Sequence, residues 1–551
     1  MDVLSLIKCN SKVSLCGLEG SALAYMLARI GQELNQPLFI VIPSLDDAQK
    51  IAEALKFFLS PLEPLPLNEK VFLLPEEPSL PYTGVSPRPE VLGKQFKALF
   101  GLLNINSPVV VTTPKMLISY FIPVSNFNQK IQIYQKGEEI PREEFIQFLQ
   151  FLGYERLNLV EGVGEFSVRG EIIDIFCPLY KWPLRLEFFG DTLESVRLFN
   201  PITQRSERHL NNFILIPANP IPHQEAAFKQ AKKRIEALNL TKEIAQKICS
   251  FLEIPIHQPG IEDYFPLFYE KTETLFDYLP EKTIFCLVQP GQLEKTAHFF
   301  EKKVRSHLKE LIEEKRIHLP FKYTIFPWRK IKNRLNNHKQ ILCYALPFLK
   351  TDVPIAQFKA KIPFAHLSFS QKQSHFKPQI EKWQKMGYSI SLVASHPWAQ
   401  QRLAALFETW HYIVQTKTPP FQHEPGISIY RGILSEGFIL PEARLVILGE
   451  RDWQIRTEPL VELPKKKELL PVSSFEDLKP GNLLVHVQHG IGCYQGLKTV
   501  TSGGITGEFL VIEYQDKDKL YLPIDRLHLV QKYKGIGDKL PSRQIRWKNL
   551  G

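Results

Sequence analysis

A glycine-containing turn near the N-terminus has the outline of a phosphate-binding loop. A working loop of this kind leads from a strand into Gly-Lys-Ser/Thr at a helix N-terminus. There, backbone N–H groups hold the phosphates, the lysine neutralises the outer ones and the hydroxyl ligates magnesium. Here Leu23 stands in the lysine position and Ala24 in the magnesium position. The whole turn reads Gly17-Leu18-Glu19-Gly20-Ser21-Ala22-Leu23-Ala24.

Leucine cannot supply the charge that phosphoryl transfer requires, so we expect no nucleotide hydrolysis at this turn. The alternative interpretation is an ordinary strand–turn–helix with glycine where the chain bends. Under both interpretations the turn is degenerate and non-functional as a nucleotide site. The residues concerned are Gly17, Gly20, Ser21, Leu23 and Ala24.

Two other groups of residues are of types that could do chemistry. His486, His489 and Cys493 lie close in sequence, but the two histidines fall on opposite faces of an expected strand and no fourth ligand is nearby. Neither Ser21 nor Cys249 lies in a Gly-x-Ser-x-Gly context or has a recognisable base partner. We therefore expect no metal site and no catalytic residue.

Composition indicates a soluble, multidomain protein. The 551 residues are 44% hydrophobic and 23% charged, and a chain of this length divides into roughly three to five domains. There is no run of about 20 apolar residues and no basic segment at the N-terminus, so we expect neither a membrane span nor a secretory signal. The seven cysteines are widely spaced and odd in number, which favours reduced thiols in the cytoplasm.

The charge balance favours an anionic partner. The net charge is +10 and the isoelectric point is near 9.0, values that fit contact with double-stranded DNA. Residues 480–551 hold ten Lys and Arg against six Asp and Glu, so the C-terminal end is a candidate contact. The alternative is a solvated surface without a nucleic-acid role.

The chain has an α/β pattern that is interrupted once. Residues 1–124 alternate apolar strands (37–43, 71–74, 108–113) with helices (45–59, 91–103), which predicts a parallel sheet covered by helices. The same texture returns in residues 217–350, with a helix expected at 223–252 and strands at 283–288 and 339–343.

Residues 125–216 have a different texture. The runs 170–176 and 184–191 alternate polar and apolar residues around turn signals, as antiparallel strands with one wet face do. We therefore predict an α+β domain, inserted into the α/β domain. Residues 351–465 form a further α/β domain, with strands at 388–394 and 444–448, whose role the sequence does not assign.

The last unit has an all-β pattern. Residues 466–540 contain short strands expected at 483–487, 492–497, 508–514 and 519–523, followed by a tail at 541–551. So many short strands in so few residues suggest a small SH3-like β-barrel, a type that is commonly a binding module.

Two stretches resemble a known family. Residues 168–176 (VRGEIIDIF) and 183–191 (PLRLEFFGD) closely resemble the UvrA-binding domain shared by UvrB and the bacterial transcription-repair coupling factor, Mfd. Residues 478–523, with VHVQHGIG and a Gly-rich turn, resemble the RNA polymerase-interacting domain of Mfd and of CarD-type regulators. UvrB lacks the second module and CarD regulators lack the first, so the order of the two resembles the N-terminal part of Mfd.

The resemblance also bears on the first turn. In UvrB the corresponding turn is a complete phosphate-binding loop, whereas Mfd carries a degenerate copy without ATPase activity, and Leu23 and Ala24 match the degenerate form. The resemblance also implies that residues 1–124 and 217–350 form one UvrB-like domain. In the family, an ATP-driven motor follows the polymerase-binding domain, and we expect this chain to lack that motor. ATP and magnesium are therefore expected as cofactors of the missing motor only.

The resemblance assigns UvrA binding to Arg169, Arg185 and Phe189. On a strand, Arg185, Glu187 and Phe189 share one face, which leaves the other for the core. The alternative is an ion pair between Arg185 and Glu187, with Phe189 merely packed.

In the barrel, the resemblance places Lys498, Thr499 and Val500 at the contact with the polymerase β subunit. An apolar residue just before a Gly-rich turn is able to extend the sheet of a partner. The alternative is that Val500 closes the core of the barrel.

These features together predict an adaptor that binds stalled RNA polymerase and recruits UvrA for nucleotide excision repair, without enzymatic activity of its own. In full-length Mfd a C-terminal domain masks the UvrA-binding face, so we expect this face to be available here. One alternative is part of an ATP-dependent translocase or helicase whose motor is missing, and another is a CarD-like transcription regulator.

Overall fold

A computed structural model describes most of the chain. The described residues are 3–201, 203–222, 225–236, 238, 240–252, 258–346, 353–364, 369–453, 470–471, 480–486, 490–502, 505–514, 519–523 and 530–532. None of the helices in these residues is long and apolar enough to cross a bilayer. The seven cysteines all have free thiols.

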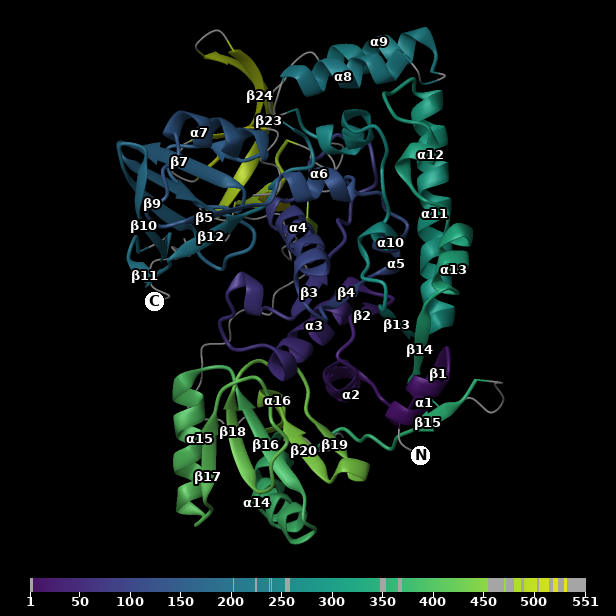
Figure 1. Ribbon diagram of the computed structural model, residues 1–551, viewed down its shortest axis with the longest axis vertical. Coiled ribbons are helices and arrows are strands. Elements are labelled where there is room, and N and C mark those ends of the chain that lie inside the picture. Colours follow the sequence, from purple (N-terminus) through teal and green to yellow (C-terminus); the bar gives the residue numbers. More distant parts are fainter. Residues whose placement is uncertain are drawn as a thin grey trace.

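A seven-stranded sheet forms the centre of the molecule, and all its neighbouring strands are parallel (Figure 1). The predicted parallel sheet is therefore confirmed. Strand β2 (Leu38–Val41) precedes residues 125–216 in the chain and β13 (Ile284–Val288) follows them, yet the two strands pair directly in this sheet. In sheet order the strands are β15 (Ile355–Gln357), β1 (Lys12–Cys16), β14 (Lys339–Tyr344), β13 (Ile284–Val288), β2 (Leu38–Val41), β4 (Val109–Thr112) and β3 (Val71–Leu74).

Helices cover this sheet, and their ends follow local sequence signals. In α3 (Leu45–Leu59), the Ser44 hydroxyl accepts a hydrogen bond from the backbone N–H of Asp47. Two aspartates in the first turn stabilise the helix by their interaction with the positive end of its dipole. α4 (Pro89–Asn104) begins with proline, which suits a first helical position. The other helices of this region are α1 (Val3–Cys9), α2 (Gly20–Leu34), α5 (Pro114–Leu117), α6 (Val124–Gln129), α10 (Leu275–Tyr278), α11 (Pro290–Glu313), α12 (Phe321–Thr324) and α13 (Trp328–Leu335).

The single helix predicted at 223–252 is wrong. The structure has two helices there, α8 (Glu225–Glu236) and α9 (Lys242–Phe251). Thr241 starts the second one, because its hydroxyl accepts a hydrogen bond from the backbone N–H of Ile244. An N-cap residue in the middle of an apolar-periodic stretch divides it into two helices.

A six-stranded sheet lies between β4 and β13 in the chain and is antiparallel except for the β6–β7 pair. We call residues 125–216 the inserted domain. Helix α7 (Arg142–Phe151) belongs to it, and β5 (Gln132–Gln135) pairs with β12 (Asn212–Leu215). In order, the strands of the larger sheet are β11 (Ser206–His209), β10 (Thr192–Phe199), β9 (Leu184–Phe189), β8 (Ile172–Ile175), β7 (Glu165–Arg169) and β6 (Glu155–Arg156).

A second α/β unit follows β15 in the chain. Its five-stranded sheet is parallel except for β19, and helices α14 (Phe369–Lys385), α15 (Pro397–Thr409) and α16 (Glu450–Trp453) belong to it. Aromatic rings join this unit to the first, since Phe421 contacts Tyr25, Phe57 and Phe58. The strands in order are β17 (Val414–Lys417), β18 (Ile427–Arg431), β16 (Ser389–Ala394), β20 (Leu445–Leu448) and β19 (Phe438–Leu440).

The described residues of the C-terminal unit form a small antiparallel sheet. The predicted SH3-like closure is not shown by them and stays a prediction. β23 and β24 form a long hairpin that projects at the top of Figure 1. In order, the strands are β21 (Leu470–Pro471), β26 (Val530–Lys532), β22 (Leu483–His486), β23 (Gly490–Ser502), β24 (Ile505–Glu513) and β25 (Lys519–Pro523).

Candidate protein-interaction site

Strand β9 divides its side chains between the core and one open face of the inserted domain. Leu184, Leu186 and Phe188 are buried, whereas Arg185 and Glu187 are only partly covered and Phe189 is exposed. Alternation along a strand puts every second side chain on the same side of the sheet. The predicted separation of a core face from an open face is confirmed.

A buried carboxylate organises the two arginines. Asp174 on β8 lies directly opposite Arg185 on β9, and only 1% of its side chain is exposed. Arg185 donates from Nε to Oδ1 at 2.7 Å and from Nη2 to Oδ2 at 2.9 Å, and Arg169 donates from Nη2 to Oδ2 at 2.6 Å. Two guanidinium groups thus offset the cost of removing one carboxylate from water. Their hydrogen bonds to it also hold both arginine side chains in place.

The two arginines differ in how much they show to solvent. Arg185 is 14% exposed, and it also donates to Oε1 of Gln204 at 2.8 Å and lies 4.1 Å from the centre of the Phe199 ring. Arg169 is 46% exposed. Arg169 therefore offers more of its guanidinium to a partner, while Arg185 is held mainly by its neighbours.

Phe189 ends β9 and is 73% exposed. It precedes Gly190, which adopts φ +62° in the turn to β10. The alternative expectation for this face is wrong, because Arg185 pairs with Asp174, Glu187 pairs with Arg197, and Phe189 is not packed. An exposed phenylalanine on a face that also carries arginine is typical of an interface anchor.

The candidate polymerase contact lies in the β23–β24 hairpin. Lys498, Thr499 and Val500 pair with Phe509, Glu508 and Gly507, close to the end of the hairpin. Lys498 is exposed, and the side chains of Thr499 and Val500 lie outside the described residues. The alternative prediction, that Val500 closes the core of a barrel, therefore also concerns a side chain outside the described residues.

Family models match both regions. The model described as UvrB interaction domain matches residues 133–220, and that described as CarD-like/TRCF RID domain matches residues 478–534. Both models match one chain, in the order that the sequence predicts. The chain is thus similar to the transcription-repair-coupling factors through both of these domains.

Curated members of this family align along nearly all of the chain. The transcription-repair-coupling factor of Myxococcus xanthus is 30% identical over 100% of this chain and 47% of the relative. Those of Bacillus subtilis and Escherichia coli are 26% and 25% identical, each over 96% of this chain and 46% of the relative. The chain thus spans about half the length of the curated relatives it matches.

The degenerate loop is enclosed by backbone. Gly17 has φ +82°, its N–H donates to the carbonyl of Tyr344 at 3.0 Å, and a Cβ at this position would overlap the carbonyl oxygen of Phe358. The N–H of Phe358 in turn donates to Cys16 at 2.9 Å. The segment after β15 therefore lies directly against the turn.

The helix after the turn is equally enclosed. Leu23 and Ala24, which stand in the lysine and magnesium positions, are buried in the core. Ser21 is buried, and its hydroxyl has no hydrogen-bond partner among the residues that the structure describes. A Cβ on Gly20 would lie 3.5 Å from Oε2 of Glu436, so a carboxylate stands close to the N-terminus of α2. Within the described residues, no group of three or more His, Cys, Asp and Glu is arranged to hold a metal ion.

Sequence reasoning missed the partner of the arginines. No specific pairing with the arginines was predicted for Asp174, Gln204 or Phe199. The alternation along β8 and β9 could have indicated Asp174, since a carboxylate on the open face of one strand commonly pairs across to an arginine on the next.

Proposed function

We propose that this chain acts as an adaptor in transcription-coupled DNA repair. The inserted domain binds UvrA, and the C-terminal sheet binds the β subunit of RNA polymerase. The two family matches support this, since one is to a UvrB interaction domain and the other to an RNA polymerase-interacting type of domain. Their presence in one chain favours a linker between two machines over a transcription regulator with a single partner.

The exposed Phe189 on the open side of β9, the same side as Arg185, is the observation that carries the UvrA contact. Phe189 and Arg169 contact the partner directly in this proposal, because they are 73% and 46% exposed whereas Arg185 is 14% exposed. Arg185 is a positioning residue, which holds Asp174 and through it Arg169. Since Asp174 already holds the two arginines, binding loses little of their side-chain entropy.

The register of the C-terminal sheet supports a polymerase contact by strand addition. β22 pairs with Gly490–Cys493 of β23, so residues 496–502 pair with β24 alone among the described residues. An unpaired strand edge of this kind is able to bind an extended segment or a sheet edge of a partner. Lys498, Thr499 and Val500 lie along that edge.

The loop at 17–24 takes no part in nucleotide hydrolysis in this proposal. The N–H of Gly17 is already bonded to Tyr344, and a buried leucine replaces the lysine that would neutralise a phosphate. The loop instead serves as a contact for the segment that leads to the second α/β unit.

The proposal is tested by two binding assays on the purified chain. We expect it to bind purified UvrA, and binding to be lost in Arg169→Ala with Phe189→Ala but kept in Arg208→Ala, which removes an exposed arginine from β11 of the same sheet. We expect Val500→Asp to abolish binding to the polymerase β subunit while UvrA binding is kept. Absence of wild-type binding to UvrA would remove the repair role and leave a CarD-like regulator.

A further inference from the structure

The positive charge of this chain is concentrated in one segment that the resemblance does not explain. Residues 290–335 hold twelve Lys and Arg against five Glu and no Asp, a net +7 out of the total of +10. The basic residues are Lys295, Lys302, Lys303, Arg305, Lys309, Lys315, Arg316, Lys322, Arg329, Lys330, Lys332 and Arg334.

This segment forms α11, α12 and α13, which lie together along one edge of the molecule, at the right of Figure 1. Helix α11 buries one side, with Leu293, Val304 and Leu308 in the core, and α13 buries Trp328 and Ile331. The basic side chains therefore occupy the outer side of both helices. We call this surface the α11–α13 face, and its exposed cations include Lys295, Lys302, Lys303, Lys309, Arg329, Lys330 and Lys332.

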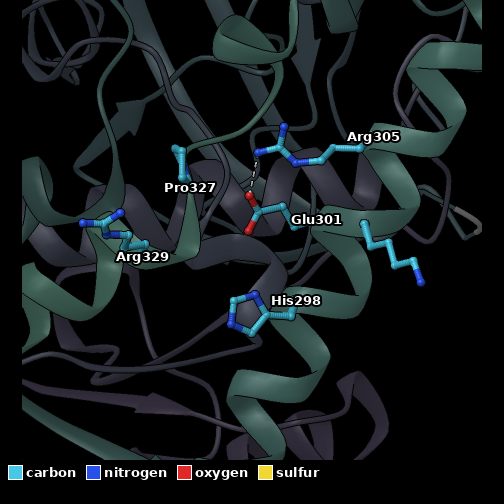
Figure 2. Close-up of a pocket in the computed structure, with 6 residues that line it drawn as sticks. His298, Glu301, Arg305, Pro327 and Arg329 are labelled. Atoms are coloured by element: carbon cyan, nitrogen blue, oxygen red, sulfur yellow. Dashed lines mark hydrogen bonds and ion pairs between the residues drawn. The ribbon is translucent and has the colours of Figure 1, made fainter.

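A hollow of about 340 Å³ lies within this face, between α11 and the start of α13. Figure 2 shows Arg305 and Arg329 on different sides of it, and its lining also includes Lys302 and His298. Its single lining carboxylate, Glu301, is already engaged, since Arg305 donates from Nη2 to Oε1 at 3.0 Å. The hollow is thus positive in spite of that carboxylate.

One cation of the hollow is held in place, and two others are exposed and unpaired within the described residues. The guanidinium of Arg305 lies 3.6 Å from the centre of the Phe321 ring, which holds it in place beside Glu301. Neither Lys302 nor Arg329 has an ion-pair partner within the described part of the chain, and both are exposed. Cations that are fixed or unpaired on one face form a site for a multiply charged anion.

The extent of the face indicates a polymer and not a small anion. From Lys295 to Lys309 the helix advances 14 residues, or roughly 21 Å at about 1.5 Å per residue, far more than one phosphate group occupies. Duplex DNA carries about one negative charge per 1.7 Å of its axis. Lysine is depleted in the interfaces between proteins, so a face dominated by lysine favours a phosphate backbone over an acidic protein.

We propose that the α11–α13 face binds the phosphate backbone of duplex DNA without reading its sequence. Figure 1 shows helices α11–α13 on the opposite side of the molecule from strand β9, which ends at Phe189. DNA on the α11–α13 face therefore leaves the proposed UvrA contact uncovered. The inference is independent of that contact, because it rests on different residues and a different ligand.

The test compares two double charge reversals in fluorescence anisotropy with a labelled duplex of random sequence, at several salt concentrations. The test variant is Lys302→Glu with Arg329→Glu. The control is Lys382→Glu with Lys385→Glu, which changes the net charge equally on exposed positions of α14. We expect the test variant to lower affinity at least tenfold. It should also reduce the slope of log K against log salt by about 2, since each phosphate contact contributes about 0.9. The control should bind like the wild-type chain.

Three results would overturn the proposal. The first is that the wild-type chain does not bind the duplex at low salt. The second is that the test and control variants weaken binding equally. The third is that the chain binds single-stranded DNA more tightly than the duplex and that Phe299→Ala abolishes this binding. The last would assign the face to single-stranded nucleic acid, because Phe299 is exposed on α11 near Lys302 and could stack on bases. Lys302→Gln with Arg329→Gln should reproduce the loss in part, and thermal melting establishes that each variant is folded.

Discussion

The carboxylate of Asp174 lies beneath the guanidinium of Arg185, which donates to both of its oxygens, at 2.7 and 2.9 Å. Asp174 is almost fully buried, and its second ligand, Arg169, is much more exposed than Arg185. One buried charge thus links a well-covered arginine to an accessible one. The two arginines of the proposed UvrA contact are therefore not equivalent, and substitution should separate them.

We predict that Arg185→Leu destabilises the chain more than Arg169→Leu does. Loss of Arg185 leaves the buried carboxylate with a single, half-exposed partner, and breaking a buried ion pair costs on the order of 3 kcal/mol. Loss of Arg169 leaves the Arg185–Asp174 pair intact and should cost about 1 kcal/mol or less. Urea unfolding followed by circular dichroism measures both. Equal losses of stability would show that Arg185 does not organise this face.

We predict that Phe189→Ala leaves stability within about 0.5 kcal/mol of the wild-type value, because the ring is 73% exposed and packs little. If Phe189 anchors UvrA, the same change should lower affinity by about 2 kcal/mol, roughly 30-fold. Isothermal titration calorimetry with UvrA gives the second number. Ile413→Ala, at an exposed apolar residue of the second α/β unit, is the matched control and should bind normally.

The central fold could be predicted from sequence because short apolar runs and caps are local signals. Residues 45–59 were expected as a helix and form α3 with the same ends, since Ser44 and the aspartates after it fix its start. The division of β9 into a buried and an open side followed from alternation alone. The break before α9 was missed because apolar periodicity continued through Thr241 and masked its capping role.

Contacts between distant residues could not be predicted in this way. Phe358 encloses Gly17 although the two are far apart in sequence, and no local pattern joins them. The α11–α13 face was not predicted for a different reason: the C-terminal end has a visible excess of +4, whereas the larger excess of +7 lies in 290–335, where acidic residues are interspersed. A running sum of charge along the chain would have found the segment, and only the fold shows that its cations share one face.

The contact at Gly17 makes a prediction about stability. Gly17→Ala should destabilise the chain by about 3 kcal/mol or more, because φ +82° is strained for alanine and its Cβ would overlap the carbonyl of Phe358. Gly84 has a similar φ of +76° but open space around it, so Gly84→Ala should cost only about 1 kcal/mol. Urea unfolding compares the two. Similar losses at both positions would mean that the segment after β15 does not press against the turn.

A buried carboxyl group makes a prediction about pH. Asp263 accepts a hydrogen bond from the backbone N–H of Tyr82 at 2.6 Å, and burial raises the pKa of its carboxyl group to about 7, with Glu262 adding to the rise and Lys115 opposing it. In the unfolded chain this group ionises near pH 4. Between about pH 4 and 7 the folded state therefore binds more protons than the unfolded state, so Asp263 lowers the stability of the chain as pH rises through that range.

Asp263→Asn should remove this dependence, because asparagine is neutral and its carbonyl can still accept from Tyr82. We expect the variant to be no more stable than the wild-type chain near pH 4 and more stable by a few kcal/mol at most near pH 7.5, where the native carboxylate is buried and charged. Urea unfolding at the two pH values measures the difference. A variant that loses as much stability as the wild-type chain between them would mean that this carboxyl group ionises normally in the fold.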